Sequence, residues 1–194
     1  DIYNFRNSNK SNTEMIPTSI FDEHHPDWAR RFRIIYDQLC SGDIIHSDLD
    51  AIWLKNPEKY ITPKYDIISS SGNMPARIYE RLGLSLCMGW IYIKSTLNTK
   101  KLFESIINSK ATFDDQILVN NYLMDQGISS VSKIGSNASN IVFGDINTLV
   151  LDQSVISRHK PHDNNTYIAH PLTTRHIDRE LYFQKNGLWC LDDK

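Results

Sequence analysis

The sequence has little that could hold a small disulfide-rich protein together. Its three cysteines, Cys40, Cys87 and Cys190, are odd in number and lie far apart in a chain of 194 residues. Disulfide frameworks need paired cysteines and an oxidising compartment, so this usage predicts a reducing compartment, and we expect a cytoplasmic location. A chain of this length can instead bury roughly 70% of its unfolded surface in an ordinary core. We therefore expect one domain over residues 1–194.

Long apolar runs and an excess of one charge are also missing. No apolar run approaches the ~20 residues of a membrane span, and the N-terminus lacks the apolar core of a signal peptide. We therefore expect no membrane span in this segment. Lysine and arginine number 21 against 23 aspartate and glutamate residues, and the net charge is −2. A nucleic-acid groove would carry a basic stripe, so nucleic acid is not an expected partner.

What the chain does contain is an alternation of apolar patterns that is typical of an α/β protein. A polar loop at residues 7–13 should follow the first strand, and the polar, histidine-rich segment at 154–165 is interpreted as a mobile loop beside the site. The predicted elements are a strand at 2–6, helices at 26–40, 76–82, 98–108 and 115–126, and a strand pair within 141–151 that turns at Gly144-Asp145 or Asn147.

The most informative stretch is Ser47-Asp48-Leu49-Asp50, which follows an apolar strand pattern at residues 42–46. Alternate side chains of an extended chain share a face, so we expect Asp48 and Asp50 to converge on one cation while Leu49 points into the core. Mg²⁺ and Mn²⁺ prefer oxygen ligands and commonly fill open positions with substrate phosphates. An EF-hand loop is excluded, because Trp53 stands where that loop requires glycine. A solvated acidic turn remains the alternative.

Several further motifs follow in a fixed order, and together they resemble the nucleotide-diphospho-sugar transferase family over roughly residues 30–192. The matching segments are RFRIIYDQLCSGDIIHSDLDAIWLKNP at 31–57, Asp66-Ile67-Ile68-Ser69-Ser70, Gly89-Trp90-Ile91-Tyr92-Ile93-Lys94-Ser95, Asp115-Gln116 with Asn120, Tyr167-Ile168-Ala169-His170-Pro171, and Gly187-Leu188-Trp189.

The resemblance implies a GT-A-like, Rossmann-like α/β fold with a mixed, mostly parallel central sheet flanked by helices. Fewer residues than usual precede the Asp-x-Asp motif, so we also expect an abbreviated N-terminal half. The implied activity is transfer of a hexosyl or deoxyhexosyl group, generally with retention, from a nucleoside-diphosphate donor, a UDP-sugar above all. The acceptor would be a glycan or glycoprotein, and the cofactor Mn²⁺ or Mg²⁺.

The resemblance also assigns roles to six residues. Asp50 and His170 would hold the metal, and Asp48 would face both the metal and the ribose. Arg31 would face the nucleotide. Independently of the resemblance, the charge that develops on the diphosphate makes Lys160 or Arg175 candidates for further stabilising cations. Asp115 and Gln116 would contact the donor sugar as the catalytic pair.

Each of these residues also has a structural interpretation. His170 could be an ordinary buried histidine, Arg31 could share the solvated helix face of Arg30 and Arg33, and Asp114 with Asp115 could cap a helix. Two histidine pairs, His159-x-x-His162 and His24-His25, have no cysteine or histidine partners at the spacing of a zinc site. We interpret them as exposed loop histidines.

Two other classes of function stay open. A metal-dependent nucleotidyltransferase or phosphohydrolase would also use paired aspartates, but it usually needs carboxylates for a second metal. A noncatalytic nucleotide-sugar-binding module would not need Asp48, Asp50 and His170 together. Departures at Ser69-Ser70-Ser71-Gly72 and at Met88, where relatives carry other residues, suggest a sugar that is unusual for the family, such as a 6-deoxyhexose.

Overall fold

The structure, a computed structural model, describes residues 2–5, 13–16, 28–109, 114–158, 163–172 and 176–188. The helices are α1 (Trp28–Ser41), α2 (Ala76–Leu82), α3 (Leu97–Ser109), α4 (Asp115–Asp125) and α5 (His176–Lys185), with a 3-10 turn at Glu58–Tyr60. The strands are β1 (Ile2–Phe5), β2 (Thr13–Ile16), β3 (Asp43–Ser47), β4 (Ile52–Trp53), β5 (Ile67–Gly72), β6 (Ser85–Ile93), β7 (Ile128–Ile134), β8 (Ala138–Phe143), β9 (Ile146–Leu151), β10 (Ile156–Ser157) and β11 (Ile168–Ala169).

Eight strands form a twisted mixed sheet in the order β2-β1-β3-β6-β5-β9-β8-β7. The α/β class and the mixed sheet are confirmed, but the expectation that the sheet is mostly parallel is wrong. Among the strand pairs that the structure describes in this sheet, β5 and β9 are the one parallel pair. The reason lies partly in the turns at Gly135 and Gly144, whose positive φ angles of 59° and 52° close hairpins between β7, β8 and β9. Short hairpins join antiparallel neighbours.

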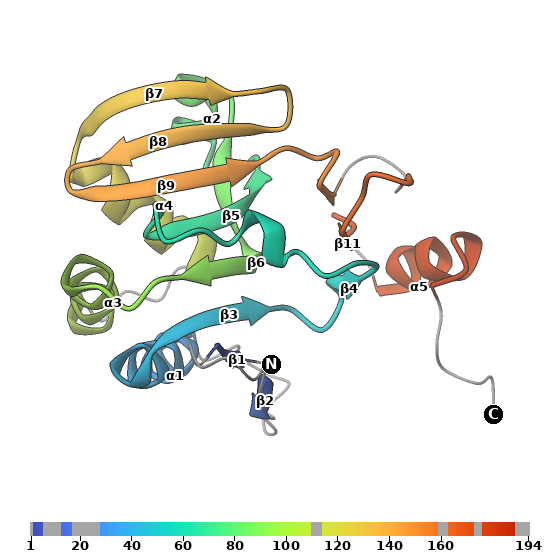
Figure 1. The fold of residues 1–194 in the computed structure, drawn as a ribbon, viewed down its shortest axis with the longest axis horizontal. Coiled ribbons are helices and arrows are strands. Elements are labelled where there is room, and N and C mark those ends of the chain that lie inside the picture. Colours follow the sequence, from blue (N-terminus) through green and yellow to red (C-terminus); the bar gives the residue numbers. More distant parts are fainter. Residues whose placement is uncertain are drawn as a thin grey trace.

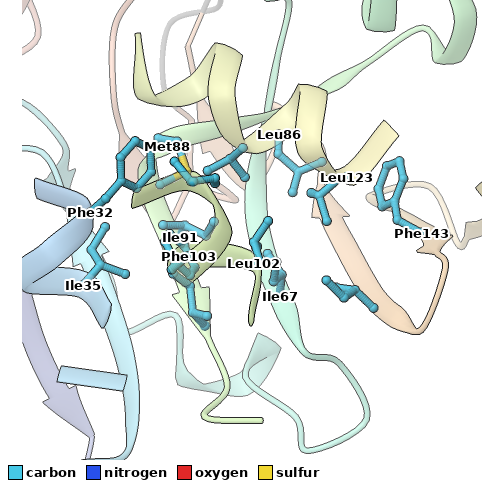
Figure 2. Close-up of a cluster of buried hydrophobic side chains, with 14 of the residues drawn as sticks. Phe32, Ile35, Ile67, Leu86, Met88, Ile91, Leu102, Phe103, Leu123 and Phe143 are labelled. Carbon is cyan, nitrogen blue, oxygen red and sulfur yellow. The ribbon is translucent and has the colours of Figure 1, made fainter. Parts of the chain in front are cut away.

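Helices α1, α3 and α4 cover one face of the sheet, and their apolar sides meet it in a continuous core (Figure 2). Phe32 and Ile35 come from α1, Leu102 and Phe103 from α3, and Leu123 from α4. The ring centroids of Phe32 and Phe103 lie 6.0 Å apart. The amphipathic spacing of these residues is therefore explained by packing against strands.

The other face of the sheet is buried as well, which explains why the central strands have near-continuous apolar sequences. In β3, Ile44 packs toward the helices whereas Ile45 packs into a second cluster, and Ile67 and Ile68 of β5 divide in the same way. The second cluster is covered by a small sheet of three short strands in the order β10-β11-β4.

The predicted helices are confirmed within one or two residues. The strand pair turning at Gly144-Asp145 is also confirmed, although β8 begins at Ala138, three residues before the predicted range. The interpretation of residues 154–165 as a mobile loop is wrong in part, because Val155–Ser157 are buried and residues 156–157 form β10. Residues 159–162 of that segment, and 7–12 of the predicted polar loop, lie outside the described residues. Strand β7 was not predicted. None of the helices described here has the length and apolar character needed to cross a membrane.

A bulge interrupts the pairing of β6 with β5 close to the Asp48–Asp50 motif. Ser69 pairs with Ile91, but the next residue, Ser70, pairs with Cys87, so Met88–Trp90 are left out of register with β5. Bulges re-aim a strand and are common beside active sites. The pairing with β3 continues through the bulge, since the Gly89 carbonyl accepts a 2.8 Å hydrogen bond from the backbone N–H of Asp48. Figure 1 shows β3, β5 and β9 pointing toward the side on which β4, β11 and α5 lie.

Candidate active site

The acidic motif forms a tight turn at the end of β3. The N–H of Ala51 donates to the carbonyl of Asp48 at 3.0 Å, which closes the turn around Leu49 and Asp50. The convergence of Asp48 and Asp50 is therefore produced by a turn and not by strand alternation. Leu49 is 82% exposed, so the expectation that it points into the core is wrong. Trp53 anchors the segment by donating to Ser47 Oγ at 3.1 Å and packing edge-on against Trp90.

The small sheet brings His170 to this turn from more than a hundred residues away. Strand β11 pairs with β4 on one side and β10 on the other. The N–H of His170 donates to Ser157 O at 2.8 Å, which fixes the residue just beyond β11. Its Nε2 atom lies 3.3 Å from Asp50 Oδ1 and 3.8 Å from Asp48 Oδ2. One ligand atom from each of the three residues lies within 4.8 Å of the other two, so together they could hold a metal ion.

Arg31 of α1 joins the acidic turn to the start of α4. Its Nη2 atom lies 3.2 Å from Asp48 Oδ1, and its Nη1 atom donates to Asp115 Oδ2 at 2.5 Å. Arg30 and Arg33 are exposed, so of the three neighbouring arginines it is Arg31 that enters the site. Burial alone would lower the pKa of Arg31, but Asp115 and Asp48 outweigh it and raise that pKa.

Two neighbouring aspartates at the start of α4 have different roles, one in capping the helix and one in the site. Asp114 is the N-cap and accepts from the backbone N–H groups of Gln116 and Ile117. Asp115 is buried at 4% exposure and points to Arg31, although its Oδ1 atom also accepts from the Gln116 N–H at 2.7 Å. The Gln116 side chain donates to Met74 O at 2.9 Å, on the connection that follows β5.

Asn120, the last residue of the same motif, has a structural role. Its buried amide accepts from the Leu86 N–H at 2.9 Å and donates to Leu86 O at 2.7 Å. These two bonds satisfy a backbone peptide of β6 and tie α4 to the strand. The helix start is thereby held at a fixed distance from the bulge that carries Gly89.

Burial and neighbouring charges shift the ionisation of the site. Burial would raise the pKa of Asp48, but the His46 imidazole, whose Nε2 atom lies 3.5 Å away, and the Arg31 guanidinium outweigh it, so this pKa lies well below its usual range. Burial lowers the pKa of His46. Burial also raises the pKa of Asp115, against the opposing charge of Arg31. Asp48 is therefore ionised at neutral pH, as a metal ligand must be.

Two arginines near the acidic turn were not foreseen from the sequence. Arg179 of α5 places Nη1 2.9 Å from Asp50 Oδ2. Arg158, which follows β10 and is buried, contacts the sulfur of Cys87 and lies 3.4 Å from His170 Nδ1. Their distance from the motif in sequence left no pattern that could have identified them.

Other predicted residues could not be placed. Lys160, Arg175, His24-His25 and the pair His159 and His162 lie outside the described residues. Cys40 and Cys87 are both free, and Cys190 also lies outside the described part of the chain. The cytoplasmic location therefore stays a prediction.

The donor set fits a divalent cation. Two carboxylates and one imidazole suit Mn²⁺, while Mg²⁺ would depend more on the carboxylate oxygens and on water. The positive groups of Arg31 and Arg179 stand beside the same carboxylates. Such a centre can bind an anion that also coordinates the cation, which is the usual arrangement for a substrate phosphate.

Comparison with known proteins agrees with this arrangement. A family model described as nucleotide-diphospho-sugar transferase matches residues 29–179. The matched range contains the acidic turn, the start of α4 and His170. The mixed α/β architecture is consistent with the GT-A-like fold of such transferases. No curated protein matched the chain, and no solved structure did.

Proposed function

This chain belongs to the nucleotide-diphospho-sugar transferase family, and we propose that it is a metal-dependent glycosyltransferase. It would move a hexosyl or deoxyhexosyl group from a nucleoside-diphosphate donor, a UDP-sugar in the first place, to a glycan or glycoprotein acceptor. The observation that carries this proposal is the convergence of Asp48, Asp50 and His170 beside two guanidinium groups. The carboxylates can bind the metal cation, and the arginines beside them can bind the diphosphate that the cation coordinates.

Asp48, Asp50 and His170 would hold Mn²⁺ or Mg²⁺. When bound there, the cation supplies Lewis-acid stabilisation to the negative charge that develops on the departing diphosphate. The Trp53 indole and the Asp48–Ala51 turn keep the ligands in place before the cation arrives. Such prior positioning lowers the reorganisation needed during the reaction.

Arg31 and Arg179 would bind the diphosphate. A guanidinium group offers several N–H donors in a planar fork and keeps its charge at any relevant pH. Each of the two arginines is paired with one of the proposed metal ligands, Asp48 or Asp50. A cation that takes over those carboxylates would leave N–H donors of both arginines for the phosphate oxygens. Contacts that strengthen as the leaving group gains charge accelerate the chemical step.

Asp115 and Gln116 would contact the donor sugar. Both oxygens of Asp115 already accept hydrogen bonds, one from Arg31 and one from the Gln116 N–H. This arrangement supports a role in stabilising positive charge at the anomeric carbon more than a role as a free nucleophile. It favours retention by displacement on the front face of the sugar, in which the leaving diphosphate assists the acceptor hydroxyl.

The end of β5 would contribute to the choice of sugar. A Cβ atom at Gly72 would lie 3.0 Å from Gln116 Nε2, so the strand end directly adjoins the proposed sugar-binding amide. Ser69 and Ser70 are fully buried and Gly72 has no side chain, so this strand end offers few groups to the sugar hydroxyls. A deoxyhexose is a donor sugar that this composition supports.

A test of the proposal combines a panel of nucleotide sugars with Mn²⁺ and compares the wild type with Asp50→Ala. We expect transfer from one donor in the panel, its loss on chelation, and its loss in Asp50→Ala with an unchanged melting temperature. Asp37→Ala removes an exposed carboxylate from α1 and serves as the control. Full activity of Asp50→Ala in the presence of chelator would contradict the metal-dependent mechanism.

The same panel separates the alternative functions. A nucleotidyltransferase or phosphohydrolase would cleave the donor without forming a glycoside, and a binding module would bind the donor without turnover. Two-metal enzymes of the first kind need a second set of carboxylates. Within the described ranges, Asp48, Asp50 and His170 form the one cluster of potential ligands.

A further inference from the structure

We propose that Cys87, together with Arg158, fixes the orientation and the tautomer of His170 so that its Nε2 lone pair faces the cation. Cys87 is then a positioning residue for a metal ligand. The inference rests on the proposed function in one respect only, namely that His170 binds the cation through Nε2.

The two nitrogen atoms of the His170 ring face different surroundings. Nε2 faces the carboxylates, 3.3 Å from Asp50 Oδ1 and 3.8 Å from Asp48 Oδ2. Nδ1 faces away from them and lies 4.0 Å from Cys87 Sγ and 3.4 Å from Arg158 Nη1. All of the groups around Nδ1 are buried, with exposures of 6% for His170, 1% for Cys87 and 8% for Arg158.

The chemistry of imidazole determines which neighbour Nδ1 can use. A ring that coordinates through Nε2 carries its hydrogen on Nδ1, so Nδ1 becomes a donor that needs an acceptor. A guanidinium group has no acceptor, so Arg158 cannot fill this role. Of the two side chains that face Nδ1, Arg158 and Cys87, only Cys87 offers an acceptor, which is its sulfur. Metal-binding histidines usually donate this hydrogen to a carboxylate, a carbonyl or water, and here a cysteine takes that position.

Arg158 also contacts the sulfur, on the side of the sulfur where the His170 ring lies. Its Nη1 atom contacts Cys87 Sγ, and the backbone N–H of Gly89 donates to the same sulfur at 3.4 Å. With the ring N–H of His170, three N–H donors therefore converge on a single sulfur atom. The backbone fixes this geometry, because Arg158 O accepts from the Leu172 N–H at 3.0 Å and the preceding Ser157 O accepts from the His170 N–H at 2.8 Å. The segments that carry the guanidinium and the imidazole are therefore tied to each other next to the sulfur.

The β6 bulge provides the space for this arrangement. A Cβ atom at Gly89 would lie 1.9 Å from His170 Cε1, so the ring rests on the bare backbone of the bulge. Cys87 is the residue at which β6 returns to register with β5. Gly89 thus limits where the ring can lie, and Cys87 defines which way its nitrogen atoms point.

The first experiment measures Mn²⁺ affinity by calorimetry in the presence of saturating UDP, for wild type, Cys87→Ala and Cys87→Ser. Cys87→Ala removes the acceptor, and we expect affinity to fall by about 10- to 100-fold, as when other outer partners of metal ligands are lost. Cys87→Ser keeps an acceptor and should recover most of the affinity. Met88→Leu, a change of similar volume at the next residue, which packs in the helix-side core, should bind as the wild type does.

The second experiment reads the tautomer directly from ¹⁵N chemical shifts of the histidine rings with Mg²⁺ and UDP, using His170→Gln to assign the signal. We expect hydrogen on Nδ1 in the wild type and a mixture of tautomers in Cys87→Ala. This readout does not depend on activity, and the wild-type spectrum alone can contradict the inference even where Cys87→Ala folds poorly.

The outcomes separate the two proposals. A wild type that binds neither Mn²⁺ nor Mg²⁺ with UDP overturns the cation site and this inference with it. A wild type that binds the cation, accompanied by a folded Cys87→Ala of equal affinity or by hydrogen on Nε2 in the loaded wild type, overturns the role of Cys87 and leaves the proposed function intact.

Discussion

Gly89 shows how a single missing side chain can create a ligand position. It lies within a strand, where glycine has no advantage of propensity and weakens packing. Its value here is space, since any Cβ atom would overlap the ring of His170. A glycine inside a strand pattern often marks such a close approach.

Gly89→Ala should therefore displace His170 from the acidic turn. We expect Mn²⁺ affinity to fall by at least about tenfold, and the free energy of unfolding to fall by about 1–3 kcal/mol because the core is overpacked. Calorimetry with UDP and thermal unfolding measure the two effects. In a His170→Ala background the same substitution should cost little stability, because the colliding ring is gone. An equal cost in both backgrounds would show that Gly89 is needed for another reason.

Asp115 and Asp114 are adjacent carboxylates with different partners, which makes them a matched pair. Asp115→Asn removes the charge that faces Arg31 and should lower kcat by about 100-fold while changing KM little, if the carboxylate acts mainly in the transition state. Asp114→Asn should change neither, because asparagine caps a helix about as well as aspartate. Steady-state kinetics at saturating Mn²⁺ measure both. Equal kinetics for the two variants would return Asp115 to a purely structural role.

The residues that could be predicted from the sequence share one property, which is a local motif in a recognisable order. Asp48, Asp50 and His170 were predicted as one group, and they lie together. Leu49 was placed on the wrong side, because the pattern of two carboxylates around an apolar residue fits both a strand and a tight turn. Arg158 and Arg179 have no motif of their own, and only the three-dimensional arrangement shows that they face the site.

At the scale of elements, α5 connects the C-terminal region to the acidic turn through Arg179. Its guanidinium forms an ion pair with Asp50, a carboxylate that we propose as a metal ligand. A metal cation and this guanidinium would therefore compete for the oxygen atoms of Asp50 when no diphosphate is present. With a diphosphate bound, Arg179 gains phosphate oxygens as alternative partners.

Arg179→Ala should for this reason have two effects of opposite sign. Mn²⁺ affinity without nucleotide should rise severalfold, because the competing cation is gone, whereas UDP affinity with Mn²⁺ should fall by about tenfold or more. Calorimetry under the two conditions measures both changes. Lys185→Ala removes a positive charge from the exposed end of the same helix and should change neither. A loss of Mn²⁺ affinity in Arg179→Ala would instead make Arg179 a support for Asp50.

The end of β6 is tied to the start of β3 by Tyr92, whose hydroxyl donates to Asp43 Oδ2 at 2.7 Å. Tyr92→Phe removes this bond to a charged acceptor and should lower the free energy of unfolding by about 1.5–3 kcal/mol at pH 7. Burial, followed by the bond to Asp43, raises the pKa of Tyr92. A raised pKa gives stability that is fully present below the unfolded-state value, about pH 10, and is lost as the pH rises further.

The wild type should accordingly lose its advantage over Tyr92→Phe above about pH 10. Urea unfolding at pH 7 and at several values above pH 9 measures the difference. A constant gap across this range would mean that the hydroxyl is not held in its neutral form by the fold.

The short strands explain which elements escaped prediction. Strands β4, β10 and β11 have two residues each, which is too short for any periodicity to develop. Strand β7 is exposed along nearly all of its length and has no apolar alternation toward a core. The helices α1 to α4, by contrast, carry apolar stripes or clear end signals and were predicted closely.

At the scale of the whole molecule, the site forms where three separate parts of the fold end. Arg31 links the end of β3 to the start of α4 through Asp48 and Asp115, and His170 brings the segment after β11 to Asp50. The end of β3 points toward β4, β11 and α5 (Figure 1). The overall α/β class followed from the alternation of patterns, but the sequence did not show which strand pairs are parallel and which are antiparallel. That depends on which strands become neighbours, and β6 lies between β3 and β5 although it follows both in sequence.

Charge balance across these parts predicts how ligands bind. With the histidines counted as neutral, the described residues of the site carry equal numbers of carboxylates and guanidinium groups, namely Asp48, Asp50 and Asp115 against Arg31, Arg158 and Arg179. A divalent cation alone therefore leaves excess positive charge in a partly buried site. A diphosphate alone meets carboxylates that repel it. Each ligand removes the obstacle to the other.

Mn²⁺ and UDP should consequently bind with positive coupling. We expect each to increase the affinity of the other by roughly 5- to 150-fold, a coupling of about 1–3 kcal/mol, and by linkage the two factors must be equal. Calorimetric titration of Mn²⁺ with and without UDP, and of UDP with and without Mn²⁺, measures both factors. In thermal unfolding, the two ligands together should raise the melting temperature by more than the sum of their separate effects. Asp50→Ala should abolish the coupling while leaving the protein folded. Independent binding of Mn²⁺ and UDP in the wild type would show that they do not share one site, and the arrangement of Arg31 and Arg179 around the acidic turn would then need another explanation.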